Sequence, residues 1–232
     1  MIYNKKSKEE LFMDIEYNLF KRTSVDYEKL LKYGFKKIDD KYIYEKKFMN
    51  GDFKAIITIV DNYVTGKVID LETNDEYFAI KTIMNGSFVS KVRDEYLSIL
   101  FDIKEKCFEN KLFITDQANR IANFIMKKYQ VEPEFLWENS SGHGVFRNKV
   151  NNKWFGIIMN VDGMKFENKS GEVEVLNIKL DKLKIQDLLS KNGYFPAYHM
   201  NKKSWISIIL DEYLDDETII KLVSESYDQV NK

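Results

Sequence analysis

The chain carries two kinds of hydrophobic repeat, one with the spacing of helices and one with the alternation of strands. Apolar residues at three- and four-residue spacing predict helices at residues 8–22, 25–33, 87–108, 116–129, 181–192 and 215–230. Alternating or continuous apolar runs bounded by turn residues predict strands at residues 41–48, 53–60, 63–70, 76–80, 145–149, 153–161, 172–179 and 205–210. Hairpin-linked strands flanked by helices are typical of the α+β class, so we expect antiparallel sheets covered by helices on one side.

The pattern pauses at residues 109–114, where we place a domain boundary. We expect an N-terminal α+β domain at residues 1–112 and a second domain at residues 113–232, both of ordinary size for a domain. Residues 53–61 align with residues 154–162 at a constant offset of 101. The N-terminal half is therefore either a diverged copy of the second domain or an α+β extension with its own core.

Composition places the chain among ordered proteins without a membrane span. Hydrophobic residues make up 44% of the chain, and it has only 2 prolines and 10 glycines, which argues against disorder. No apolar run reaches the ~18 residues that a transmembrane helix needs. Residues 1–10 lack the apolar core of a signal peptide. A single cysteine, Cys107, excludes an intramolecular disulfide and a Cys-rich metal site. We therefore expect a cytoplasmic protein.

Charge is balanced over the whole chain but not locally. The net charge is −1, so no overall positive field attracts nucleic acid. Residues 141–203 nevertheless hold 11 basic and 6 acidic residues, whereas residues 204–232 hold 2 basic and 7 acidic residues. This asymmetry predicts one mildly basic face and one acidic helix in the second domain.

A polar loop rich in hydrogen-bond donors precedes the last predicted strand. Gly193 and Pro196 predict a turn, and Trp205 begins the apolar run of that strand. The candidate binding residues of the loop are Tyr198, His199, Asn201, Lys202 and Lys203. The neighbouring predicted hairpin adds Arg147, Lys149 and Lys153, which join the same face if the strands are adjacent. Amide and ammonium donors of this kind suit phosphate contacts.

Four short motifs resemble the MmcQ/YjbR family. They are Tyr198–Lys202 followed by Trp205, Lys153–Met159, Leu176–Lys179, and Ser226–Tyr227 in the final helix. The resemblance covers roughly residues 115–230 and implies a CyaY-like α+β domain, also called a double wing, in a family whose members are described as DNA-binding proteins. Ser204 departs from the family pattern, which often carries a second histidine before the tryptophan.

The parts needed for most enzyme chemistry are missing from the sequence. His143 and His199 are the only histidines, and neither has the spacing of a metal site. The sequence contains no Gly-rich phosphate loop, nucleophile elbow or Cys–His arrangement. We therefore expect a non-enzymatic protein without a cofactor. A weaker hypothesis keeps His199 as an acid or base; its other interpretation is a hydrogen-bonded residue that shapes the loop.

These observations lead to two main hypotheses. The first is a nucleic-acid-binding module that uses the basic side of the sheet and the loop from His199 to Lys203. The alternative is a module that binds a protein or small ligand in an interdomain cleft lined by Tyr198, His199, Asn201 and Trp205. A third possibility follows from the frataxin-like proteins, which share the implied fold and bind iron through acidic surfaces. The acidic residues that resemble such a surface are Glu212, Asp215, Asp216 and Glu217.

Overall fold

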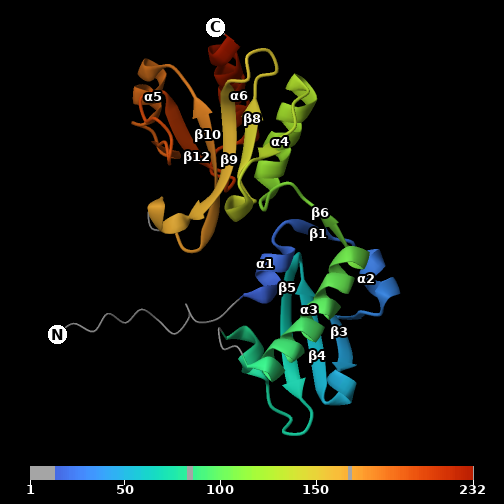
Figure 1. Cartoon of the computed structure of the whole chain (residues 1–232). Helices are drawn as coiled ribbons and strands as arrows, with labels where there is room; N and C mark the ends of the chain where they lie inside the picture. Colours follow the sequence, from blue (N-terminus) through green and yellow to red (C-terminus); the bar gives the residue numbers. More distant parts are fainter. Residues whose placement is uncertain (1–13, 83–85, 167–168, 232) are drawn as a thin grey trace, which may run out of the picture. The chain divides into compact units, whose positions relative to one another are not determined.

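The computed structural model describes residues 14–82, 86–166 and 169–231, and the chain forms two compact units (Figure 1). The first unit contains residues 1–111 and the second contains residues 112–232, so the division lies beside the predicted boundary. Both units combine antiparallel sheets with helices, which confirms the predicted α+β class. Each unit has its own hydrophobic core and is described separately below.

The N-terminal unit is a four-stranded antiparallel sheet with helices on one face (Figure 1). Its helices are α1 (Ile15–Phe20), α2 (Tyr27–Tyr33) and α3 (Ser87–Cys107). Its sheet has the order β2 (Lys36–Ile38), β3 (Lys41–Phe48), β4 (Phe53–Val60) and β5 (Tyr63–Asp70). A separate pair joins β1 (Thr23–Val25) to β6 (Phe108–Asn110). Burial alternates residue by residue along β4, as expected for a strand with one face toward the core.

The segment after β5 does not form the predicted strand. At residues 76–80 only a single bridge joins Glu76 to Ile69, and a 3-10 helix follows at Phe78–Lys81. This prediction is wrong because Arg93 of α3 binds the backbone of the segment, donating to the carbonyl oxygens of Ile80 at 2.8 Å and Thr82 at 2.9 Å. Of the predicted helix at residues 8–22, residues 8–13 lie outside the described part of the chain.

The C-terminal unit is a six-stranded antiparallel sheet whose helices pack on one face (Figure 1). The strand order is β11 (Tyr194–Pro196), β12 (Trp205–Ile209), β10 (Glu172–Lys179), β9 (Trp154–Asp162), β8 (Gly144–Arg147) and β7 (Glu134–Phe135). The helices are α4 (Asp116–Tyr129), α5 (Lys182–Leu188) and α6 (Asp216–Asn231), and 3-10 turns lie at Glu138–Ser140 and Gly163–Lys165. Ile121, Ile158, Leu176, Ile206 and Val223 belong to the core between the helices and the sheet.

A bulge in β9 changes which side chains face the helices. Phe146 pairs with Gly156 and Arg147 pairs with Trp154, so Phe155 is an extra residue between them. Phe155 therefore packs into the core beneath the helices, whereas Trp154 points to the opposite face of the sheet. Without this bulge, strict alternation would give Trp154 and Ile158 the same face.

The two units share part of their chain order. In each, a helix precedes a meander of four antiparallel strands, and a long helix packs on that sheet later in the chain. The aligned segments at offset 101 are β4 and β9, and each is the third strand of its meander. The C-terminal unit adds α5, β11 and β12 before its last helix. This correspondence is consistent with duplication, which stays a prediction.

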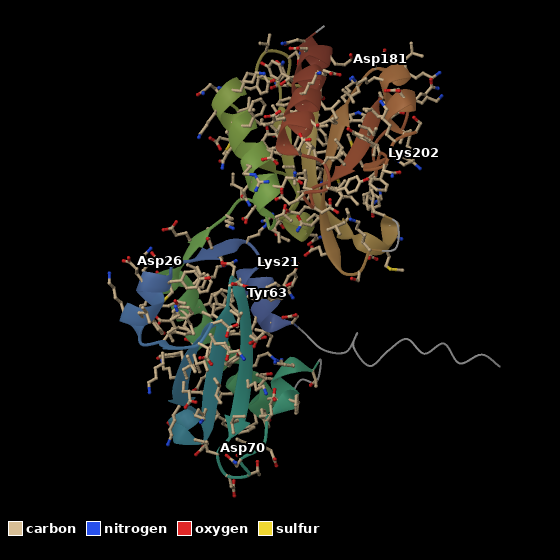
Figure 2. All side chains as sticks on the ribbon, turned by 180° about the vertical axis from the view of Figure 1, so that it is seen from behind. Lys21, Asp26, Tyr63, Asp70, Asp181 and Lys202 are labelled. Atoms are coloured by element: carbon tan, nitrogen blue, oxygen red, sulfur yellow. The ribbon has the colours of Figure 1, made fainter. Side chains whose placement is uncertain are left out.

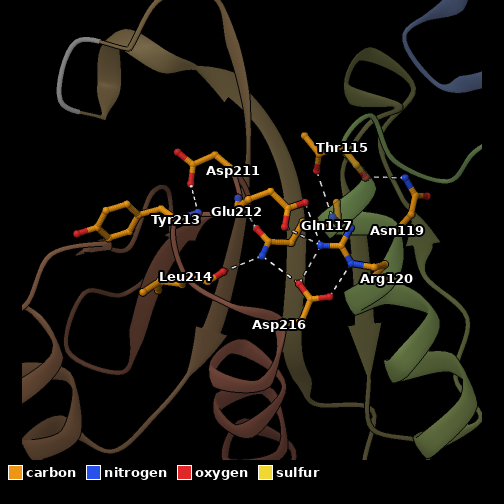
Figure 3. A network of polar contacts seen from close by, with 10 residues as sticks. Thr115, Gln117, Asn119, Arg120, Asp211, Glu212, Tyr213, Leu214 and Asp216 are labelled. Carbon is orange, nitrogen blue, oxygen red and sulfur yellow. Dashed lines mark hydrogen bonds and ion pairs between the residues drawn. The ribbon is translucent and has the colours of Figure 1, made fainter. Parts of the chain in front are cut away.

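A polar network joins the start of α4 to the loop before α6 (Figure 3). Arg120 donates from Nε to Asp216 at 2.6 Å and from Nη2 to Glu212 at 2.7 Å. Gln117, which is fully buried, donates to the carbonyl oxygen of Leu214 and accepts from the amide of Glu212. Among the described residues, no group of three or more His, Cys, Asp or Glu side chains is placed to hold a metal ion. Two of the four acidic residues proposed to bind iron, Glu212 and Asp216, instead form ion pairs with Arg120.

Replacing Arg120 with alanine is expected to lower the melting temperature by a few degrees near neutral pH, because a hydrogen-bonded network is lost rather than one isolated pair. Arg120 holds the pKa of Asp216 below its usual range. Asp216 has a pKa of about 3.9 in the unfolded chain and a lower pKa in the folded protein. Its ionised side chain therefore contributes its full stabilisation above about pH 3.9, and this contribution is lost as pH falls through the pKa of the folded protein. Thermal melts from pH 7 to pH 2 should show the difference between the two proteins shrinking at the acidic end.

The matched control is Lys191→Ala, which removes an exposed pair with Asp187, four residues earlier in the chain. It should leave the melting temperature almost unchanged. An Arg120→Ala difference that persists at pH 2 would contradict the assigned role of Asp216.

Candidate functional site

The sheet face of the C-terminal unit that lies opposite the helices is covered by aromatic side chains. We call this surface the aromatic face, and its residues are Trp137, His143, Trp154, Phe166, Phe195, Tyr198 and His199. It includes both histidines of the chain and two of its three tryptophans, and the third, Trp205, begins β12 on the same side. The apolar floor beneath it contains Val145, Ile157, Met159 and Val175.

The half of the aromatic face over β7, β8 and β9 combines two indoles with an arginine. The ring of Trp137 lies edge-on to that of Trp154, with centroids 6.0 Å apart. The guanidinium of Arg147 lies over the Trp154 ring at 5.2 Å and donates to Glu134 at 2.9 Å. His143 donates from Nε2 to the carbonyl oxygen of Asn160, at 3.1 Å, and its ring contacts Trp137. Arg147 is thus a half-buried stacking group rather than a free cation.

The other half of the aromatic face is fixed by a buried polar network. Asn177 of β10 is fully buried and donates to the carbonyl oxygen of Tyr198 at 3.0 Å. Its amide oxygen accepts from the hydroxyl of Ser207, which in turn accepts from the amide of Tyr198 at 2.9 Å. Tyr198 therefore begins the β11–β12 loop in a fixed position, with the His199 ring against its own at 4.1 Å. His199 itself has a positive φ of 54°.

Lysines gather at one end of this sheet, which we call the basic end and define as Lys149, Lys153, Lys179, Lys202 and Lys203; Lys179 is half-buried and the other four are exposed. The register explains their proximity: Lys179 pairs with Trp205, and the preceding Ile178 pairs with Gly156. The β8–β9 turn and the β11–β12 loop therefore leave the sheet at the same end, with β10 between them. Figure 2 shows Lys202 on the C-terminal unit, on the same side in that view as Asp181, which follows β10.

The structure thus brings the two groups of predicted residues to one end of the sheet, although their strands are not adjacent. β9 and β12 flank β10, so Lys153 and Lys203 are separated by about two strand spacings, roughly 10 Å. Within the described part of the chain, none of the five ammonium groups has an ion pair. Lys202 and Lys203 are exposed, as are Lys149 and Lys153.

Asn201 has a structural task inside the loop. Its side-chain oxygen accepts from the amide of Lys203 at 2.9 Å, and its carbonyl oxygen accepts from the amides of Ser204 and Trp205. This is an Asx-type turn, the local bonding that asparagine favours. Its amide oxygen is therefore engaged within the loop, and any ligand would meet its amide nitrogen.

The structure adds two residues to this surface that are not among the predicted site residues. Lys179, which ends the Leu176–Lys179 motif, lies on the aromatic side of the sheet because it is two residues from Asn177. Trp137 follows Pro133 in a segment without periodicity, and it is 39% exposed. The available signal in the sequence was a tryptophan in a short connection without helix or strand periodicity, since tryptophan is usually largely buried in a regular core.

The single cysteine of the chain belongs to the other unit. Cys107 is buried in the N-terminal unit, and burial raises the pKa of its thiol to about 11. The thiol is therefore protonated at neutral pH and is a poor nucleophile. No helix in the described ranges is both long enough and apolar enough to cross a membrane.

Comparison with known proteins identifies the C-terminal unit. The profile of the family described as YjbR matches residues 126–229, which contain all four motifs of the predicted resemblance. The uncharacterised protein YyaQ of Bacillus subtilis (strain 168) is 32% identical over 108 residues, which are 46% of this chain and 92% of that protein.

Two solved structures are also similar. A crystal structure of a Pseudomonas syringae protein has 32% sequence identity and a TM-score of 0.46, covering 47% of this chain and 95% of its own. The DUF419 domain of Deinococcus radiodurans protein DR2400 has 18% identity and a TM-score of 0.39, covering 50% of this chain and 78% of its own. On the sequence relationships, the chain belongs to the YjbR family through its C-terminal unit.

Proposed function

We propose that the C-terminal unit binds nucleic acid, with the basic end contacting phosphates and no catalytic step. The observation that supports this proposal best is the convergence of Lys149, Lys153, Lys179, Lys202 and Lys203 from three strand ends, without ion-pair partners in the described ranges. Unpaired lysines are compact, mobile cations, which suits contact with a phosphate backbone. The balanced net charge of −1 limits the field to this local patch.

Binding of this kind should weaken steeply with salt, because each neutralised phosphate releases counterions. The double variant Lys202→Ala/Lys203→Ala should bind more weakly than the unmodified chain at about 50 mM salt, and its plot of log affinity against log salt should be shallower. The expected change in slope is about 0.7 per lost contact for a single strand and about 0.9 for a duplex. Fluorescence anisotropy with labelled duplex and single-stranded DNA measures both quantities.

The matched control is Lys127→Ala. Lys127 is exposed in the last turn of α4, on the helix-covered side of the sheet, and has the same charge. It should leave both affinity and slope unchanged. Equal effects of the two variants, or no binding to either DNA at about 50 mM salt, would contradict the proposal.

A second candidate function has one observation in its favour. A cavity of about 230 Å³ lies next to the aromatic face and is lined by Phe195, Ile209, Lys169, Asp211 and Tyr213 among others. Lys169 and Asp211 form an ion pair with each other there, and a small ligand with both charges would replace that pair with one contact to each group. This alternative predicts a rise in melting temperature with a zwitterionic ligand such as a free amino acid, independent of Lys202 and Lys203.

A further inference from the structure

Trp137 is the most exposed indole of the aromatic face. It is 39% exposed, whereas Trp205 is 7% exposed and Trp154 is half-buried. The adjacent Leu136 is also exposed, at 45%, whereas the ring of Phe135 packs against Phe113 on the helix side of the sheet. An exposed tryptophan next to an exposed leucine is the kind of apolar surface that binding sites use.

Cationic groups lie on the far side of the neighbouring indole, Trp154. Trp137 contacts Trp154, whose other neighbour is the Arg147 guanidinium at 5.2 Å. Lys153 immediately precedes Trp154, and Lys149 lies in the same turn. A ligand that places a flat ring on Trp137 can therefore place a negative group near these lysines. Flat rings linked by negative groups are the chemistry of a nucleic acid strand.

The shape of the sheet decides between a duplex and a single strand. Five strand spacings of about 4.8 Å make the six-stranded sheet about 24 Å wide, whereas the major groove is about 12 Å wide and admits a helix or a two-stranded ribbon. The aromatic face therefore cannot enter the groove of a duplex, whose bases are stacked on one another. A single strand can lie along the face with its bases turned toward the indole.

We propose that the aromatic face selects single-stranded nucleic acid, with a base stacked on Trp137 and the adjoining phosphates at Lys149 and Lys153. This inference rests on the proposed function and adds the class of target. It also separates two roles: Trp137 supplies stacking without charge, whereas the basic end supplies the dependence on salt.

The test is anisotropy with labelled oligothymidine of about 20 nucleotides, longer than the roughly 4–16 that one domain covers, and with a duplex of equal length. Oligothymidine should bind at least tenfold more tightly than the duplex. Trp137→Ala should weaken oligothymidine binding roughly 5- to 150-fold, the usual effect of losing one stacked base, while leaving the salt slope unchanged. Trp137→Phe, which keeps a ring, should retain most of the affinity.

Leu136→Ala is the matched control, because Leu136 is adjacent, apolar and 45% exposed but cannot stack. It should bind like the unmodified chain. Tryptophan fluorescence should be quenched by oligothymidine, and less so in Trp137→Ala.

Each remaining outcome has a definite meaning. A duplex that binds as tightly as oligothymidine, or a Trp137→Ala variant that matches Leu136→Ala, overturns the single-strand inference while the lysine variants can still support the proposed function. Failure of both oligonucleotides to bind at about 50 mM salt overturns both proposals. Stacking of an apolar peptide on Trp137 instead would appear as quenching by the peptide without any effect of oligothymidine.

Discussion

Gly66→Ala is expected to destabilise the N-terminal unit by about 2–3 kcal/mol, a large effect for one added methyl group. Gly66 lies in β5 and faces the buried hydroxyl of Tyr96, which donates to the buried carboxylate of Glu16. A Cβ atom at this position would overlap the Tyr96 hydroxyl and lie 2.5 Å from Glu16 Oε1. Burial raises the pKa of Tyr96 above its usual range, so the hydroxyl keeps the proton that it donates.

The cost follows from the lack of room for either partner to move. Tyr96 is fully buried and Glu16 is 4% exposed, so moving the ring breaks their hydrogen bond inside the core. Urea unfolding can separate the two units, because all three tryptophans lie in the C-terminal one. Far-UV circular dichroism should therefore show a transition at lower urea in Gly66→Ala, while the tryptophan transition keeps its position.

Gly156→Ala is the matched control, a glycine within β9 of the other sheet. Its added Cβ would lie 3.7 Å from Phe146 and 3.9 Å from Leu176, which are ordinary contact distances. The tryptophan transition should shift little in this variant. An unchanged dichroism transition in Gly66→Ala would show that the packing around Tyr96 can relax.

Strands were predictable from the sequence wherever one or both of their faces are buried in a core, because burial then sets the hydrophobic pattern of the strand. Residues 53–60, 63–70 and 172–179 match β4, β5 and β10 residue for residue, because each strand has at least one face in a core. The short edge strands β7 and β11 were missed. Two or three residues have no measurable period, and these strands exist only because their backbone pairs with the next strand along the chain.

The residues of the candidate site were predictable from the sequence, but their positions relative to one another were not. The loop residues were found because polar donors between a turn and an apolar strand stand out in a sequence. Their proximity to Lys149 and Lys153 depends on β12 pairing with β10, and strand order is not encoded in local periodicity. The bulge at Phe155 is a second such feature, since it turns Trp154 toward the aromatic face.

A buried hydrogen-bond network holds the first residue of the β11–β12 loop in place. Asn177 donates to the carbonyl oxygen of Tyr198, and Ser207 bonds both to Asn177 and to the amide of Tyr198. These residues share one set of buried hydrogen bonds, so the free energies of their substitutions should not add. The loop that presents Lys202 and Lys203 thus depends on the Asn177 side chain of β10, the strand that lies between β9 and β12.

Asn177→Leu is expected to destabilise the C-terminal unit by about 3 kcal/mol and to release the β11–β12 loop. Leucine has similar size but leaves the carbonyl oxygen of Tyr198 without its side-chain donor and the hydroxyl hydrogen of Ser207 without its acceptor, at a cost of about 1–3 kcal/mol for each buried group. Tryptophan fluorescence in urea should show the loss of stability. Limited trypsin digestion should show faster cleavage after Lys202 and Lys203.

The comparison that isolates the network uses three further variants. Ser207→Ala should cost less than Asn177→Leu, and the double variant should cost clearly less than the sum of the two, because the same bonds are lost only once. Asn123→Leu places the same substitution at an exposed position of α4 and should change neither unfolding nor cleavage. If Asn177→Leu left the cleavage rate unchanged, the loop would be held by the packing of Tyr198 against Phe166, whose ring centroids are 5.9 Å apart, rather than by hydrogen bonds. In that case Tyr198→Ala, and not Asn177→Leu, would be the substitution that frees the lysines of the basic end.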